Sequence, residues 1–288
     1  MKNISKTIVF LLLLSLCLIK RPSLINGIIY GINLWKTCLF PSIFPLLILS
    51  DLALSTNIIK IISESIGPIF KKIFNIPKEA AYVLFMSFFT GCPSNAKYIK
   101  DLLDNKMIDN TEAIKILSIA QLYNPNLIIT ITPFLTSKSK LFLIIGNLFC
   151  NLLIGLINRH IKCNYYKAIK KQITFSLTNS INNAINTLLN ILGVIVIFSA
   201  LTSIFKINHP LFTGIFEITN GISKINTSEI NALFMCTLML SFGGLSIIYQ
   251  IKGILKEYKL DYTLYYKSRI MHIFLFLILT LIYIRYYL

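Results

Sequence analysis

The most constraining feature of this sequence is a pair of interruptions in its apolar segments between residues 83 and 127. The apolar run at residues 82–90 stops at Gly91-Cys92-Pro93, and the next one is broken at Asn124-Pro125-Asn126. Glycine and proline end helices at such points, because glycine adopts unusual dihedral angles and proline lacks a backbone N–H. In a very apolar chain, broken helices are tolerated only where their free backbone groups are buried in protein or line a cavity.

The composition is that of a membrane protein. The chain is 55% hydrophobic with a mean hydropathy of +0.72, and only 14% of its residues are charged, against about 25% in soluble proteins. Several runs approach the roughly 20 residues that cross a bilayer as a helix. We therefore expect an all-α polytopic protein of the cell membrane, with about seven or eight hydrophobic segments and the lipid bilayer as its first partner.

The excess of basic residues does not indicate nucleic-acid binding. The formal charge is +17, but the lysines and arginines are scattered between apolar runs and accompany no recognition motif. Basic residues at helix ends and in cytoplasmic loops are typical of membrane proteins. We expect no nucleic-acid partner, and a homo-oligomer remains open.

Cysteine and histidine give no sign of catalysis or metal binding. The chain has six cysteines but no C-x-x-C motif, so neither a disulfide framework nor a zinc site is predicted. The histidines are isolated, and no nucleophile–base or paired-carboxylate arrangement is recognisable. We expect a non-enzymatic protein without a cofactor.

The order of segments divides the chain into four parts. Residues 1–24 form an N-terminal transmembrane anchor with a short helix at 7–19, because Lys20-Arg21-Pro22 stands where a cleavage site would be. Residues 25–158 form a first repeat, 159–175 a basic loop and 176–288 a second repeat. The basic loop is expected on the cytoplasmic side.

The first repeat is predicted to contain several kinds of helix. Residues 25–54 form a span kinked at Pro41 and Pro45, and residues 57–76 form an interfacial amphipathic helix. A charged helix at 95–105 places Lys97 and Lys100 each four residues before an aspartate. Spans at 113–135 and 141–157 complete this half.

The second half is predicted to repeat the first. Residues 206–225 match 57–76 in character, Gly243-Gly244 takes the place of the Gly91 break, a charged helix at 252–257 follows, and the last span is 270–284. Interrupted segments at matching positions of two repeats are a sequence indication of a transporter-like binding site. We therefore expect the two glycine breaks to lie close together.

Four motifs resemble those of the sporulation integral membrane proteins of the YlbJ type, which are grouped with the nucleoside-recognition Gate-domain proteins. Gly91-Cys92-Pro93-Ser94-Asn95-Ala96-Lys97 is similar to the family's Gly-Tyr-Pro-x-Gly-Ala-Lys element. Residues 117–125, 216–221 and 241–250 match three further elements, with Glu217, Phe242 and Gln250 at motif positions.

The resemblance implies an endospore-forming bacterium and a role in spore development, in the mother-cell or forespore membrane. It names no substrate. The sequence departs from the family pattern at Cys92, at Asn95 and at Gln121-Leu122-Tyr123, where the family has an aromatic residue, a glycine and Asn-Asn-Ser. If the family's polar Asn-Asn-Ser patch contacts a solute, this chain would bind it differently or not at all.

The candidate substrate-binding residues lie at the breaks and beside them. Lys97 sits in the first turn of its helix, where it opposes the helix dipole and needs an anionic ligand or carboxylate. A structural role for the glycines and Pro93 stays equally open, since small residues also allow close helix packing. The expected set is Gly91, Pro93, Ser94, Asn95, Lys97, Asn124, Glu217, Asn220, Ser241, Gly243, Gly244 and Gln250.

Two acids stand in apolar surroundings. A carboxylate in hydrocarbon costs roughly 2.5 kcal/mol or more, so each needs a partner, water or a proton. Asp51 lies near the end of a span, and we assign it to the membrane interface. Glu217 lies beside a break at Thr219-Asn220-Gly221, and we expect it to share one cavity with Lys97 and Gln250.

Two functions remain open from the sequence. The first is a transporter-like protein that moves a small polar or anionic solute through a site between the breaks. The second is a non-transporting scaffold that recruits a spore-envelope partner. Polar residues that converge on a cavity favour the first, and a packed, dry midplane favours the second.

Overall fold

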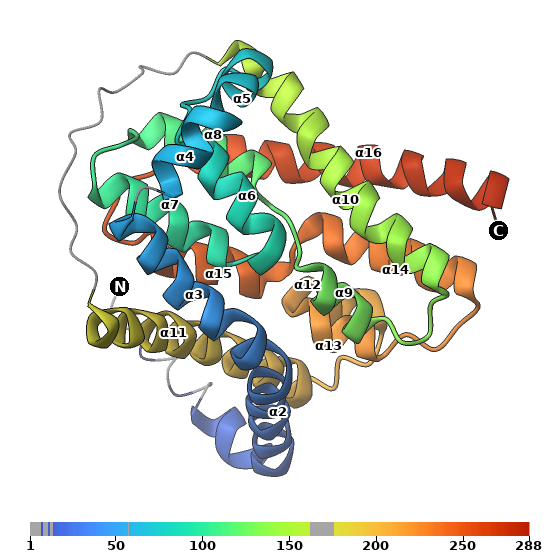
Figure 1. The fold of residues 1–288 in the computed structure, drawn as a ribbon. Helices are drawn as coiled ribbons and strands as arrows, with labels where there is room; N and C mark the ends of the chain where they lie inside the picture. The colour runs from blue at the N-terminus through green and yellow to red at the C-terminus, as the bar shows by residue number, and fades with distance from the viewer. Residues whose placement is uncertain (1–6, 8–10, 12–13, 57, 162–175, 288) are drawn as a thin grey trace.

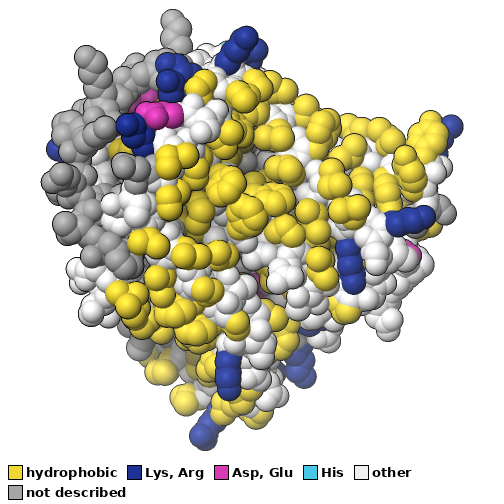
Figure 2. Space-filling view, in the orientation of Figure 1, with side chains coloured by type: hydrophobic (Ala, Val, Ile, Leu, Met, Phe, Trp, Pro, Cys, Tyr) yellow, Lys and Arg dark blue, Asp and Glu magenta, His cyan; other side chains and the backbone are white. Residues whose placement is uncertain are grey.

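The computed structural model describes residues 7, 11, 14–56, 58–161 and 176–287, and its regular elements there are helices (Figure 1). Five stretches are long and apolar enough to cross a membrane: Arg21–Ala53, Ser137–His160, Leu177–Ile204, Glu229–Ile254 and Thr263–Tyr287. Figure 2 shows hydrophobic side chains over most of one face, with Lys and Arg toward its margins. The chain is an all-α polytopic membrane protein, and the remaining apolar segments form shorter helices.

Two expected segments lie largely outside the described residues. Of the anchor helix predicted at 7–19, residues 8–10 and 12–13 are not described, and the basic loop is described only as far as Ile161. The cytoplasmic location of that loop therefore stays a prediction.

The first span is a continuous bent helix. α2 (Arg21–Leu34) passes through a π-helical turn, η1 (Trp35–Leu39), into α3 (Phe40–Ser55). The Phe40 N–H donates to the Trp35 carbonyl, five residues back, directly before Pro41, which cannot donate. The expected irregularity therefore takes the form of a π-turn ahead of the first proline. The span packs against α11 (Leu177–Ile204), where the Trp35 indole donates to the Leu188 carbonyl at 3.0 Å.

The amphipathic segment predicted at 57–76 consists of two short helices, α4 (Ile58–Ser65) and α5 (Gly67–Phe74). Ile59 and Phe74 are buried, while Ile61 and Ile69 face outward. Pro68 stands in the first turn of α5, where the helix can accommodate proline. Because proline is unfavourable inside a helix, the segment forms two helices and not one.

Two pairs of helices form tight hairpins. α6 (Ala80–Thr90) and α7 (Ser94–Asp104) reverse direction at Gly91, and the rings of Tyr82 and Tyr98 meet with centroids 5.9 Å apart. α12 (Pro210–Phe216) and α13 (Ile218–Ser223) reverse at Glu217, and a Cβ on Gly221 would lie 2.4 Å from the Gly214 Cα. Each hairpin therefore presents its break as a tip.

Two other pairs form broken helices. α8 (Asn110–Ile119) and α9 (Pro125–Ile131) are separated by extended residues 120–124, so the continuous span predicted at 113–135 is wrong. α14 (Glu229–Phe242) continues into α15 (Gly244–Ile254) across Gly243. The charged helix predicted at 252–257 is also wrong, because the helix restarts at Gly244 and ends at Ile254.

Two long helices support the broken ones. α10 (Ser137–Ile157) and α16 (Thr263–Tyr287) are antiparallel, as the hydrogen bond from Asn158 to Ser268 at 3.1 Å and the stacked rings of Phe142 and Tyr283 require. α8 and α9 both pack on α10, and α14 packs on α16. Figure 1 shows α10 crossing the front of the molecule, with α16 and α14 beside it.

Among the described residues, each half has a long helix, a hairpin, a broken helix and a second long helix in that order, but the first half also has α4 and α5 before its hairpin. The internal repeat stays a prediction. By order of elements, the Gly91 tip would correspond to Glu217, and residues 120–124 to Gly243-Gly244. The sequence comparison paired the Gly91 and Gly243 breaks instead, because it matched glycine-containing apolar runs. Whether the chain reverses or continues at a break depends on packing, which those runs do not reveal.

Candidate functional site

The first hairpin tip is built by close backbone approach. Gly91 has φ +74°, and a Cβ there would stand 2.5 Å from the Asn124 nitrogen. Only glycine fits this position, since other residues would both strain the backbone and clash. The tip therefore rests directly on the extended segment of the first broken helix.

The second hairpin tip carries a carboxylate. Glu217 caps the start of α13, and its Oε2 accepts a 2.6 Å hydrogen bond from the Asn220 N–H. Glu217 is 4% exposed, and within the described part of the chain it makes no ion pair. A carboxylate has about four lone-pair sites, so Glu217 keeps acceptor capacity for a further donor beside the local groups of Thr219 and Asn220.

The extended segment 120–124 has its backbone carbonyls satisfied from three directions. The Asn95 amide donates to the Ala120 carbonyl at 2.9 Å, and the Asn151 amide to the Gln121 carbonyl at 3.0 Å. The Cys92 N–H donates to the Leu122 carbonyl at 2.8 Å. This pattern meets the requirement that freed backbone groups at membrane depth find partners in the protein. It gives Asn95 a structural role.

The second broken helix bends at two left-handed glycines. Gly243 and Gly244 have φ +90° and +69°. The Tyr123 hydroxyl lies 3.6 Å from the place of a Cβ on Gly243, and the Gly214 carbonyl lies 3.2 Å from that of Gly244. The tyrosine backbone also contacts the Gly91 tip, so the two glycine breaks lie on either side of one tyrosine, close together as predicted.

Both hairpin tips and both broken helices line one cavity. Its walls include Pro93 and Glu217 from the tips, Tyr123 from the extended segment, and Ser246 and Gln250 from α15. Its free volume is about 30 Å³, enough for about one or two water molecules. The Ser246 hydroxyl is buried without a hydrogen-bond partner among the described residues, which indicates room for water or a polar solute group at this wall.

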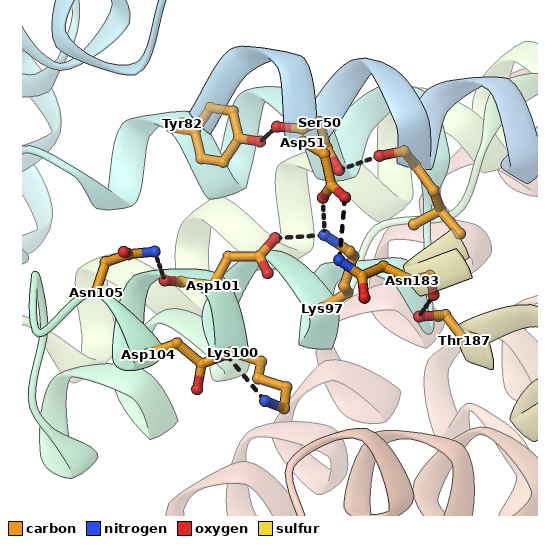
Figure 3. Close-up of polar contacts among 11 residues, drawn as sticks. Ser50, Asp51, Tyr82, Lys97, Lys100, Asp101, Asp104, Asn105, Asn183 and Thr187 are labelled. Atoms are coloured by element: carbon orange, nitrogen blue, oxygen red, sulfur yellow. Dashed lines mark hydrogen bonds and ion pairs between the residues drawn. The ribbon is translucent and has the colours of Figure 1, made fainter. Parts of the chain in front are cut away.

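Lys97 does not share this cavity. Its ammonium lies 2.5 Å from Asp51 Oδ1 and 2.7 Å from Asp101 Oδ2 (Figure 3), and the Asn183 amide reaches Asp51 Oδ2 at 3.5 Å. The cavity shared by Lys97 and Glu217 is therefore a wrong prediction. The location of Asp51 at the membrane interface stays a prediction. Lys97 lies one turn beyond the tip and faces α3, where Asp51 supplies the carboxylate that the sequence left unassigned.

The other predicted residues surround the cavity or support it. Asn124 caps α9 by accepting from the Asn126 N–H at 2.8 Å. Asn220 donates to the Thr202 hydroxyl at 3.1 Å. Ser94 and Ser241 are buried, and their hydroxyls have no partner within the described residues.

Sequence reasoning missed Arg269 on α16. Arg269 is 3% exposed, and it donates to Asn151 Oδ1 at 2.8 Å and to the Ser118 carbonyl at 3.2 Å. Asn151 also lies 3.3 Å from the His272 ring. An arginine within a long apolar helix, away from its ends, is an available signal, because intramembrane charges almost always face the protein interior.

A comparison with known proteins identifies a relative. The chain is 24% identical over 296 residues to the "Sporulation integral membrane protein YlbJ" of Bacillus subtilis (strain 168), covering 84% of this chain and 72% of that protein. The chain therefore resembles the YlbJ-type sporulation membrane proteins over most of its length. The likeness agrees with the five apolar helices, which make the chain a multi-pass membrane protein. No family model and no solved structure matches the chain, and the Gate-domain grouping stays a resemblance.

Proposed function

We propose that this protein is a non-enzymatic transport protein that moves a small polar solute across a membrane of the sporulating cell. The observation that carries the proposal is the convergence of both hairpin tips and both broken helices on one cavity holding Glu217 and Gln250. Discontinuous helices that meet near the centre of a bundle are the usual architecture of solute sites in secondary transporters.

The chemistry of the cavity favours a solute that donates hydrogen bonds. The Glu217 carboxylate repels anions, and the lysine that would have attracted an anion is held by Asp51 and Asp101. Hydroxyl, amide or amine groups on the solute would instead find acceptors in Glu217 and the Gln250 amide oxygen. The neutral or cationic polar class is therefore supported over the anionic one.

The central cavity, at about 30 Å³, is too small for a solute, so the conformation in the structure is a closed one. A solute larger than water requires one tip to withdraw, and the α12–α13 hairpin is the smaller candidate, with helices of seven and six residues. Withdrawal of this hairpin would carry Glu217 with it and open the cavity to one side of the membrane. Gating of one element against a fixed partner is a common form of alternating access.

The test is ligand profiling of the purified protein by thermal shift against nucleosides, amino acids, dicarboxylates and cell-wall precursors, followed by uptake into proteoliposomes. Glu217→Gln keeps an acceptor for the α13 cap, so it should fold, lose the shift and lose uptake. Glu64→Gln, at an exposed ion pair with Lys60, is the matched control. Normal spores and unchanged ligand shifts in the Glu217→Gln strain would refute transport and leave the scaffold as the better function.

A further inference from the structure

A second, larger pocket lies away from the central cavity, between α2, α11 and α13. Its volume is about 260 Å³, a little below the roughly 300–1,000 Å³ of pockets for drug-sized ligands. α2 contributes Asn26 and Tyr30, and α11 contributes Ser199 and Thr202. Ser203 of α11 donates to the Ser23 carbonyl at 2.6 Å, so the pocket lies where the amino end of one span meets the carboxyl end of another.

The lining of this pocket is polar and positively charged. Lys206 and Lys224 both line it, and its lining residues include no acid. The nearby carboxylate of Glu217 is turned to the Asn220 N–H, to which it is bonded at 2.6 Å. Lys206 is exposed and makes no ion pair among the described residues. The Lys224 ammonium donates to the Ile207 carbonyl at 2.6 Å and to the Thr213 hydroxyl at 3.3 Å. An ammonium has three donors, so a further one remains for a ligand.

An independent observation points to a ligand. Ser199 is 1% exposed, and its hydroxyl, on the pocket wall, has no hydrogen-bond partner among the described residues. Lys206 lies just beyond the end of α11 and Lys224 caps the end of α13, so each stabilises the negative pole of a helix, which by itself would explain their charge. It does not explain a buried hydroxyl without a partner beside them, because buried polar groups are normally hydrogen-bonded.

We propose that this pocket binds a phosphate-bearing anion, with Lys206 and Lys224 neutralising its charge and Ser199 donating to a phosphate oxygen. Basic pockets between transmembrane helices near a membrane surface bind the headgroups of anionic lipids. A soluble phosphate compound offers the same chemistry. The two sources differ in whether the acyl chains contribute to binding.

The test measures binding of short-chain phosphatidylglycerol to the full-length protein in detergent, by thermal shift and native mass spectrometry. Phosphatidylcholine is the lipid control, and inorganic phosphate is the soluble competitor. Lys206→Gln and Lys224→Gln should each weaken binding about fivefold, corresponding to roughly 1 kcal/mol per basic residue. Lys138→Gln, at the start of α10 and exposed, should leave affinity unchanged.

The outcomes separate the two sources. Phosphatidylglycerol binding that inorganic phosphate does not displace, and that both pocket variants weaken, assigns a lipid headgroup. Saturable binding of inorganic phosphate that both variants weaken assigns a soluble phosphate compound. If neither probe binds, or if both pocket variants bind as the Lys138→Gln protein does, the proposal is overturned. The Lys206 side chain makes no hydrogen bond or ion pair among the described residues, so the Lys206→Gln variant should fold and keeps the test decisive even if the Lys224→Gln variant does not fold.

Discussion

The guanidinium of Arg269 donates a 2.8 Å hydrogen bond to Asn151 Oδ1, and the same nitrogen reaches the Ser118 carbonyl at 3.2 Å. Ser118 lies in the last turn of α8, one residue before the end of that helix at Ile119. The arginine therefore places its positive charge at the negative end of a broken helix, where it is stabilised. Within the described residues it makes no ion pair with a carboxylate.

Replacement of Arg269 should destabilise the first broken helix. Arg269→Met leaves the Ser118 carbonyl and Asn151 Oδ1 without this donor, and each unsatisfied buried group costs about 1–3 kcal/mol. The expected result is a lower melting temperature in detergent. Arg285→Met, on the exposed end of the same helix, should melt as the wild type does, and equal effects of the two changes would contradict the role assigned to Arg269.

Lys97 is expected to matter far more than Lys100, although they stand three residues apart on α7. Lys97→Met leaves Asp51 and Asp101 facing each other without a counter-ion, and breaking a buried pair costs about 3–5 kcal/mol. The Lys100 side chain is 24% exposed and pairs with Asp104 and Glu257, so Lys100→Met should cost about 1 kcal/mol or less. Chemical denaturation of both variants in the same detergent provides the comparison.

Asp51→Asn extends that test. Lys97 keeps Asp101 as its partner in this variant, so the loss of stability should be smaller than for Lys97→Met. A larger loss of stability for Asp51→Asn than for Lys97→Met would contradict this prediction. It would mean that the Asp51 contact alone holds α3 to the hairpin.

Gly91→Ala should destabilise the protein, because it prevents the tip of the first hairpin from packing against Asn124. The backbone strain at φ +74° costs on the order of 1–3 kcal/mol, and the added Cβ would clash with the Asn124 nitrogen at 2.5 Å. Gly253→Ala is the matched control, because a Cβ there meets nothing within 4 Å. It should be neutral or stabilise α15 by up to roughly 1 kcal/mol. Melting temperatures of the two variants are the measurement.

Glu112 should make stability depend on pH. Burial, together with the nearby charges of Asp109 and Glu79, raises the pKa of this carboxyl to about 7, against the hydrogen bond it accepts from the Asp109 N–H. The folded state then holds the proton more tightly than the unfolded state. Stability is therefore greatest below the unfolded pKa and falls as pH rises toward 7.

Melting temperatures measured from pH 4.5 to 8 test this dependence. Glu112→Gln keeps an acceptor for the capping box with Asp109 but cannot ionise, so its profile should be flatter and its stability at pH 8 higher than that of the wild type. The exposed Glu64→Gln variant should follow the wild-type profile. A Glu112→Gln profile with the full wild-type slope would assign the pH dependence to another group.

Local features of the sequence determined much of this fold. Apolar length predicted the spans at α10 and α16, and the helix pairs Lys97–Asp101 and Lys100–Asp104 follow from i,i+4 spacing alone. Gly91-Cys92-Pro93 and Gly243-Gly244 marked true breaks. Proline lacks the backbone N–H that a continuing helix needs, and glycine favours the positive φ angles seen at Gly91, Gly243 and Gly244. Glu217 and Gln250 were correctly expected at one cavity.

Only the tertiary structure decided which breaks are hairpin tips and which are bends in a continuing helix. A glycine permits either geometry, and the choice depends on what the following helix packs against: α7 returns along α6, whereas α15 continues beyond α14. The same packing assigned Lys97 to Asp51, 46 residues away in the sequence, and placed Arg269 against Ser118 and Asn151. Charge pairs between distant elements leave no local pattern, because they are selected by the burial that the assembled bundle imposes.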